Sequence, residues 1–259
     1  MAQTDPASLL FAKRADQPTV REPGILSFAP PNDASSSGRF EGFYGRLYSR
    51  VIQAPRLRRA VFSLWGSADP LYELEAFMGG AIRAARNSSA SPVLVDLPSG
   101  SGTLLPFLAR EGFNGTVVEA DLAISMLRRA VALHRASASH LRAVFIHCDA
   151  LDLPLRNAVA DAVVSINGLH VVPDPASFLS EVSRVTKIGG RLWLITPVYG
   201  PSARSRTILA AANALRITPR TPPTLKELRG LLATAGFSET RWHGGLSITG
   251  LECERVAAD

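Results

Sequence analysis

Residues 93–102 read Val-Leu-Val-Asp-Leu-Pro-Ser-Gly-Ser-Gly, and this stretch decides the fold. The apolar run Val93–Val95 predicts a buried strand that ends at an acid, Asp96. Small residues follow, among them Gly100 and Gly102, and the next segment has the pattern of a helix. Glycines in such a turn let the backbone approach a ligand, and the free N–H groups of the helix start face the turn. We therefore expect an α/β sheet that binds a nucleotide-like cofactor at the carboxyl ends of its strands.

Beyond this turn, short apolar runs alternate with segments of helical periodicity. The apolar runs are Thr116–Ala120, Ala143–His147, Ala162–Ile166 and Arg191–Ile195, and the helical segments are Leu104–Arg110, Ile124–Ala136, Phe178–Thr186 and Thr224–Ala235. The alternation predicts a doubly wound, mostly parallel sheet that is covered on both faces. Two further β-like stretches, 239–243 and 247–256, flank Gly244-Gly245-Leu246 and predict an antiparallel C-terminal hairpin at a sheet edge.

Three regions of different composition divide the 259 residues. Residues 1–38 are rich in Pro, Ser and Ala, so we expect a flexible N-terminal arm. Residues 39–90 carry apolar residues at helical spacing and predict an N-terminal helical cap, whose last helix starts at Asp69-Pro70. Residues 91–259 are expected to form the cofactor-binding domain.

Composition and charge disfavour several classes of protein. The net charge of +6 is spread thinly and includes no Lys/Arg run, so no nucleic-acid partner is expected. No apolar run reaches the ~18–20 residues of a membrane span. The two cysteines, Cys148 and Cys253, form neither a CxxC pair nor a ligand cluster, so we expect no metal site. Together with the lack of a secretory signal, they favour a cytoplasmic location.

Three carboxylates follow predicted strand ends, at Asp96, Asp121 and Asp149. In an open α/β sheet these ends line one crevice. Asp121 can accept both hydroxyls of a ribose, whereas Asp149 can accept from an exocyclic amine such as that of adenine, with the Ala150 N–H facing a ring nitrogen. Glu119 is the rival acid for the ribose. We favour Asp121 because Glu119 lies two residues deeper in the strand.

The glycine turn differs from two common phosphate-binding motifs. A GxGxxG motif would need a third glycine at position 105, where Leu105 stands, and the Gly-Lys-Ser/Thr of a P-loop is missing. An NAD-dependent oxidoreductase is therefore disfavoured, although it stays an alternative.

Taken together, the motifs resemble those of class I S-adenosylmethionine-dependent methyltransferases. The nearest likeness is to the small-molecule enzymes of methyltransferase type 11, the group that includes the menaquinone and ubiquinone C-methyltransferases. VLVDLPSGSG is similar to the first motif, hydrophobic-hydrophobic-acid-x-G-x-G-x-G, with Pro98 in place of the first glycine. TVVEADLAISMLRRA resembles the second motif, CDALDLPL the third, ADAVVSINGLHVVPDP the fourth strand with its loop, and VTKIGGRLWLITP the fifth strand. The resemblance covers about Ser91–Pro197. It implies a Rossmann-like, seven-stranded sheet with only the last-inserted strand antiparallel, which agrees with the predicted C-terminal hairpin.

The resemblance implies S-adenosyl-L-methionine as the cofactor. The cofactor-binding residues expected from the motifs and their chemistry are Asp96, Pro98, Ser99, Gly100, Gly102, Asp121, Leu122, Met126, Asp149, Ala150 and Asn167. His170 follows the fourth strand, near the methionine part of the cofactor, and is the best-placed general base. The other histidines are expected to be structural or solvated: His147 in a strand, His243 in an edge strand, and His134 and His140 at the surface.

These features predict methyl transfer to a small, apolar or aromatic acceptor, as C- or O-methylation, by a monomer or homodimer. The segment Tyr199–Pro223 is suited to capping a small-molecule pocket, whereas Tyr44 and Tyr48 have the spacing of core residues and would alternatively form a lid. A protein or RNA methyltransferase on the same scaffold is one alternative. It is disfavoured because Asn167-Gly168-Leu169-His170 replaces the Asn/Asp-Pro-Pro-Tyr/Phe loop typical of amino-group targets. A catalytically inactive cofactor-binding module is the other.

Overall fold

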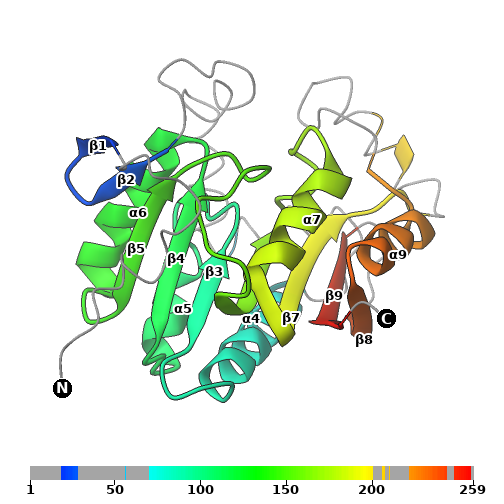
Figure 1. Cartoon of the computed structure of the whole chain (residues 1–259), viewed down its shortest axis with the longest axis horizontal. Helices are drawn as coiled ribbons and strands as arrows, with labels where there is room; N and C mark the ends of the chain where they lie inside the picture. Colours follow the sequence, from blue (N-terminus) through cyan, green and yellow to red (C-terminus); the bar gives the residue numbers. More distant parts are fainter. Residues whose placement is uncertain are drawn as a thin grey trace.

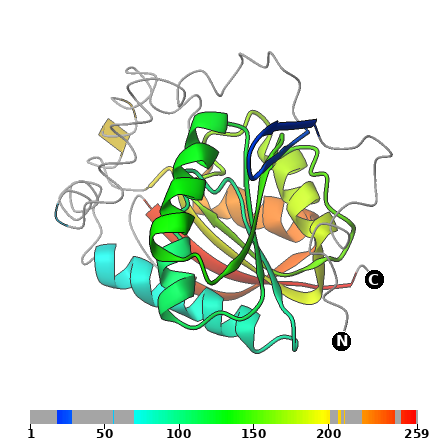
Figure 2. The same cartoon turned by 90° about the vertical axis from the view of Figure 1, so that its left-hand side faces the viewer.

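The segments that alternate along the sequence form a single nine-stranded sheet between two layers of helices (Figures 1 and 2). The computed structural model describes residues 19–28, 56, 70–200, 206–207, 210, 222–243 and 248–257. In spatial order the strands are β1 (Thr19–Glu22), β2 (Ile25–Ser27), β5 (Arg142–His147), β4 (Thr116–Asp121), β3 (Val93–Asp96), β6 (Ala160–Ile166), β7 (Thr186–Pro197), β9 (Ile248–Arg255) and β8 (Phe237–His243).

The seven strands from β5 to β8 confirm the predicted doubly wound sheet. The strands β5, β4, β3, β6 and β7 are parallel, and β9 inserts antiparallel between β7 and β8. The first strand of this unit, β3, pairs with β4 on one side and with β6 on the other. The chain therefore reverses its direction of winding at β3, and ligands of open α/β sheets bind at such a switch point.

A short N-terminal hairpin extends the sheet beyond β5, so the expectation of a flexible arm over residues 1–38 is wrong for residues 19–28. Gly24, with φ of +88°, lies in the turn between β1 and β2. Strand β2 buries Ile25 and Ser27 and pairs parallel with β5. Strands of three or four residues are too short to show a hydrophobic period, which is why the sequence pattern missed them. The rest of residues 1–38 lies outside the described ranges.

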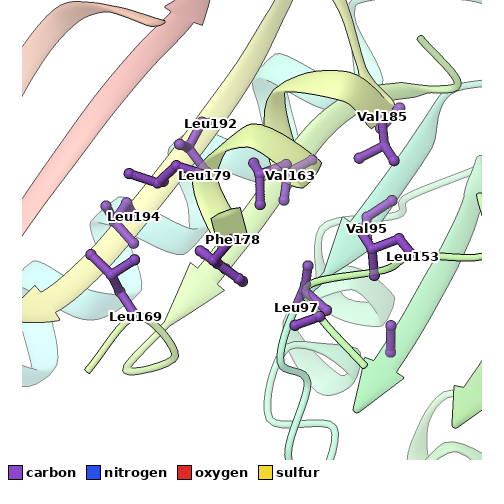
Figure 3. Close-up of a cluster of buried hydrophobic side chains, with 14 of the residues drawn as sticks. Val95, Leu97, Leu153, Val163, Leu169, Phe178, Leu179, Val185, Leu192 and Leu194 are labelled. Carbon is purple, nitrogen blue, oxygen red and sulfur yellow. The ribbon is translucent and has the colours of Figure 1, made fainter. Parts of the chain in front are cut away.

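The helices cover the two faces of the sheet. The layer on one face consists of α4 (Pro70–Arg86), α5 (Leu105–Arg110) and α6 (Ile124–Ser137), and that on the other of α7 (Pro175–Val185) and α9 (Leu225–Thr234) (Figure 2). Successive strand residues face opposite layers, as in β3, where Leu94 packs with the first layer and Val95 with the second. Each helical layer forms a hydrophobic core with its face of the sheet. Figure 3 shows the core under the second layer, in which Phe178 and Leu179 of α7 pack against the strands.

Helix α4 confirms the predicted helix start at Pro70. It belongs to the first helical layer, because it contacts β6 and β7 and packs Phe77 edge-on against Trp193, with ring centroids 5.0 Å apart. Residues 70–86 are thus part of the α/β domain, and not of a separate cap as the division at residue 90 had it. Of the remaining cap residues, the structure describes Arg56 and residues 87–90. Among the helices described, none is both long and apolar enough to cross a membrane.

Candidate functional site

The turn after β3 is fastened to both neighbouring strands at the switch point. The Leu97 N–H donates to the Val164 carbonyl of β6 at 2.9 Å, and the Ser99 N–H donates to the Ala120 carbonyl of β4 at 2.9 Å. Backbone bonds on both sides fix the turn where the carboxyl ends of β3, β4 and β6 meet.

At two positions in this region only glycine fits, because neighbouring atoms lie where a Cβ atom would be. A Cβ atom on Gly102, whose φ is +76°, would lie 2.8 Å from Leu105 Cδ1 and 3.0 Å from Ala130 Cβ. A Cβ atom on Gly168 would lie 2.1 Å from Pro98 Cδ, so the loop after β6 rests directly on the turn after β3. At Gly100, with φ of +55°, a Cβ atom would have no neighbour within 4 Å. The turn is thus packed on its inner side and leaves open space at Gly100.

The Asp121 carboxylate at the end of β4 holds the glycine turn from the other side. Its Oδ2 accepts the Gly100 N–H at 2.8 Å, and its Oδ1 accepts the Ala123 N–H at 2.7 Å. The residue is only 8% exposed. Each carboxylate oxygen has a second lone pair, so Asp121 can accept ligand hydroxyls in addition to these amides. Its role in binding a ribose stays a prediction.

The rival acid, Glu119, is fully buried two residues deeper in β4 and lies directly opposite Asp96 of β3. Both of its carboxyl oxygens are buried without a hydrogen-bond partner in the described part of the chain. Burial, and then the charge of Asp96, raise the pKa of Glu119 well above its usual value, and the nearby Ser99 hydroxyl opposes them by lowering it, although the two groups lack the geometry of an ordinary hydrogen bond. Burial, and then the charge of Asp121, likewise raise the pKa of Asp96. Three acids therefore lie close together in a poorly solvated place.

The residues expected at the adenine end lie at the carboxyl ends of β4 and β5. Asp149 follows β5, and its Oδ1 accepts the Leu151 N–H at 2.9 Å. Ala150 is 8% exposed, and Met126 is buried in the first turn of α6. Leu122 follows Asp121. The structure thus brings this group to the same edge of the sheet as the glycine turn, on its β5 side.

The loop after β6 carries a second group of polar atoms. Asn167 adopts φ of +55° and donates its N–H to the Ile195 carbonyl at 2.7 Å. Its Oδ1 and the Nδ1 of His170 are buried and find no hydrogen-bond partner among the described residues. Burial lowers the pKa of His170 to about 4, so its ring is neutral at pH 7. Asn167 and His170 thus lie on one loop at the switch point, and their place near the methionine part of a cofactor stays a prediction.

Buried polar atoms without partners occur near the carboxyl ends of β3, β4 and β6, with Glu119 on the face of the first helical layer and Ser165 on that of the second. Five residues within the described ranges contribute them: Ser99, Glu119, Ser165, Asn167 and His170. Such atoms are costly unless a ligand or water satisfies them. A cofactor with a ribose, an amino group and a carboxylate fits this set, because it brings both donors and acceptors. Ser165 was not predicted; its only signal is a hydroxyl near the end of an otherwise apolar strand.

Two histidines that were expected to be structural lie in strands. His147 lies in β5 and bonds through both ring nitrogens, while His243 lies in edge strand β8 with its Nε2 2.6 Å from Glu252 Oε1. Tyr44 and Tyr48 lie outside the described residues, as does most of the segment 199–223.

Neither a metal site nor a reactive thiol is indicated. In the described ranges, no cluster of three or more His, Cys, Asp or Glu side chains suits a metal ion. Both cysteines are buried, which raises the pKa of Cys148 far above its usual value and that of Cys253 to about 12. Neither thiol is therefore a nucleophile at neutral pH.

Comparison with known sequences gives one family. A model described as a methyltransferase domain matches residues 95–194. The chain is 37% identical over 164 residues to the demethylmenaquinone methyltransferase of Thermus thermophilus, a match covering 56% of this chain and 74% of that protein. It is 36% identical over 118 residues to the enzyme of the same name from Thermobifida fusca, covering 46% of this chain and 49% of that protein. The chain thus spans about half the length of this second relative.

Comparison with solved structures agrees on the fold. The geranyl diphosphate C-methyltransferase of Streptomyces coelicolor, solved with Mg²⁺, geranyl diphosphate and S-adenosyl-L-homocysteine, aligns with a TM-score of 0.60 at 17% identity. The alignment covers 73% of this chain and 82% of that one. The YcgJ protein of Bacillus subtilis aligns with a TM-score of 0.60 at 14% identity, over 71% of this chain and 99% of the other.

Proposed function

Because the chain belongs to the S-adenosylmethionine-dependent methyltransferases, we propose that it methylates a carbon atom of a small, apolar acceptor. The names of its relatives support this proposal, since they act on demethylmenaquinone. The acceptor of the structural neighbour, geranyl diphosphate, is also a small molecule. A protein or RNA acceptor has no comparable support.

The observation that carries the proposal is the group of buried, unpartnered polar atoms at the switch point. When bound there, S-adenosylmethionine supplies an electrophilic methyl group on a sulfonium. We assign the ribose hydroxyls to Asp121, the adenine edge to Asp149 and Ala150, and the methionine end to Asp96 and Asn167. Gly100 leaves the space that lets the backbone approach the ligand. These residues orient the methyl donor and exclude water, which is the main contribution an enzyme makes to this reaction.

His170 is the residue we assign as general base. Its buried Nδ1 has no hydrogen-bond partner within the described structure, and burial lowers its pKa to about 4, so the ring is neutral above that pH and acts as a weak base. A neutral imidazole can take a proton from an acidic carbon or hydroxyl of the acceptor as the new bond to the methyl group forms.

We further propose that the enzyme is cytoplasmic, acts as a monomer or homodimer and has no nucleic-acid partner. The thin spread of its charge of +6, with no Lys/Arg run, supports the last point.

The test is calorimetry with S-adenosylmethionine, followed by turnover assays that measure S-adenosylhomocysteine formation. Demethylated quinols and prenyl diphosphates form the acceptor panel, and a protein extract and RNA serve as comparison acceptors. We expect saturable cofactor binding and turnover with a member of the small-molecule panel only. Cofactor binding without turnover on any acceptor would indicate a binding module. Saturable NAD binding with no affinity for S-adenosylmethionine would overturn the proposal as a whole.

A further inference from the structure

His147, at the end of β5, is hydrogen-bonded through both ring nitrogens to two distant segments. Its Nε2 lies 3.0 Å from the Leu122 carbonyl oxygen, and its Nδ1 lies 2.9 Å from the Ser27 hydroxyl. A carbonyl oxygen can only accept, so Nε2 carries the hydrogen and donates to Leu122. In the neutral ring Nδ1 is then the acceptor, and Ser27 donates to it. The ring therefore connects the N-terminal hairpin to the chain after β4.

The segment that His147 holds is the one that carries the Asp121 carboxylate. Leu122 stands between Asp121 and Ala123, whose N–H donates to Asp121 Oδ1 at 2.7 Å. The Asp121 carbonyl accepts the Cys148 N–H at 3.1 Å, and Asp121 is opposite His147 in the β4–β5 pair. The backbone that follows the Asp121 side chain is thus fixed by bonds from His147 and Cys148, at the end of β5.

The N-terminal hairpin supplies the other end of the bridge. Strand β2 runs parallel to β5, with Ser27 opposite His147, and the Phe28 N–H donates to the His147 carbonyl at 2.8 Å (Figure 1). Ser27 is only 1% exposed. Backbone pairing alone would join the hairpin to the sheet, so the Ser27–His147 bond is an additional contact, and it orients the ring.

We propose that His147, oriented by Ser27, is a positioning residue that fixes the Asp121 carboxylate for the cofactor. The proposal rests on the proposed function, since it takes Asp121 to face the ribose. The hydrogen bonds from Ser27 to His147 and from His147 to Leu122, which we call the bridge, join two segments that belong to different motifs. Through the bridge, the N-terminal hairpin would affect the affinity for the cofactor.

Four variants test the bridge. His147→Phe keeps a ring and removes both bonds, His147→Gln keeps a donor for Leu122, and Ser27→Ala removes only the orienting bond. His134→Phe is the matched control, because His134 Nε2 also bonds a backbone carbonyl, that of Leu141 at 3.1 Å, and its ring also packs on a neighbour, Phe145.

The first measurement is the Kd of S-adenosylhomocysteine by calorimetry. A bond of ordinary strength corresponds to roughly a two- to tenfold change in affinity. We expect His147→Phe to raise Kd about five- to tenfold with kcat unchanged at saturating cofactor. His147→Gln should recover most of the affinity, Ser27→Ala should lose about two- to threefold, and His134→Phe should match the wild type. Equal Kd values for His147→Phe and wild type, or an equal loss in His134→Phe, would overturn the proposal.

The second measurement is amide hydrogen exchange in the cofactor-free protein, and it separates the bridge from the function. The Ala123 amide, bonded to Asp121, should exchange faster in His147→Phe and in Ser27→Ala, but not in His134→Phe. Unchanged exchange would refute the bridge whatever the protein binds. Faster exchange in a protein whose wild type binds no S-adenosylhomocysteine would instead leave the bridge intact and remove the proposed function.

Discussion

Replacing Asp121 by Asn tests the part of the site that the structure defines best. The carboxylate accepts two backbone N–H groups, from Gly100 at 2.8 Å and from Ala123 at 2.7 Å. An Asn side chain has one acceptor oxygen and one donor group, so one of the two amides must face a donor. A charge-assisted bond contributes about 1.5–3 kcal/mol, and an unsatisfied buried N–H costs about 1–3 kcal/mol. Because the turn can relax, we expect Asp121→Asn to lower the free energy of unfolding by about 2–4 kcal/mol.

Cofactor affinity should fall as well, because the variant loses the charge that strengthens bonds from the ribose hydroxyls. A loss of about 1–3 kcal/mol corresponds to a five- to 150-fold rise in the Kd of S-adenosylhomocysteine. Urea unfolding and calorimetry measure the two effects separately. Glu75→Gln is the control, since it removes an exposed charge on α4 and should change stability by less than about 0.5 kcal/mol. If the Asp121→Asn protein is as stable as the control variant, the turn does not depend on this carboxylate. If its Kd for S-adenosylhomocysteine is unchanged, another residue binds the ribose.

Three further substitutions probe neighbouring residues. His170→Ala should lower kcat by ~10²-fold or more with an unchanged cofactor Kd, and a loss in kcat below tenfold would rule out a general base. Wild-type activity should fall as the pH drops toward about 4, where the ring becomes protonated. Glu119→Gln replaces a buried acid whose pKa is raised by burial, so part of the wild-type stability is lost as the pH rises from the unfolded value of 4.5 through the higher pKa of the folded protein. The variant lacks this ionisation, so its free energy of unfolding should rise relative to that of the wild type over the same range in urea unfolding, and a pH-independent difference would contradict this. Gly168→Ala places a Cβ 2.1 Å from Pro98 Cδ and should lower the free energy of unfolding by about 1–3 kcal/mol or more. Gly230→Ala, in open space on α9, should leave that free energy unchanged or raise it, so equal melting temperatures for the two variants would argue against the close approach.

The sequence predicted the regular elements well because each has a clear hydrophobic period. Strand β6 begins two residues before the predicted Ala162, and α6 ends one residue after the predicted Ala136. The N-terminal hairpin was missed because its strands have only four and three residues, and burial of Ile25 against β5 depends on tertiary contact. Sequence patterns show local periodicity, whereas pairing between segments far apart in the chain produces no periodic pattern in either segment.

The site was predictable only where a motif is continuous. The turn from Asp96 to Gly102 and the acid Asp121 follow strands directly, so their convergence at the sheet edge follows from topology. The unpartnered oxygens of Glu119 and the Ser27–His147 bond could not be predicted. The first requires a full account of hydrogen bonds in three dimensions, and the second joins residues 120 positions apart.

The three acids of the switch point also bear on the free energy of cofactor binding. Asp96, Glu119 and Asp121 are almost fully buried, and burial with mutual repulsion raises the pKa of the first two. Carboxylates so placed are unfavourable until a cation or a hydrogen-bond donor reaches them. A ligand with an ammonium and hydroxyl groups would supply both, so we expect part of the binding free energy of the proposed cofactor to come from satisfying these acids. Asp121 differs from the other two acids, because its two bonds from backbone amides stabilise the free protein. We expect the buried Asp96 and Glu119 to favour a cationic ligand over an anionic dinucleotide.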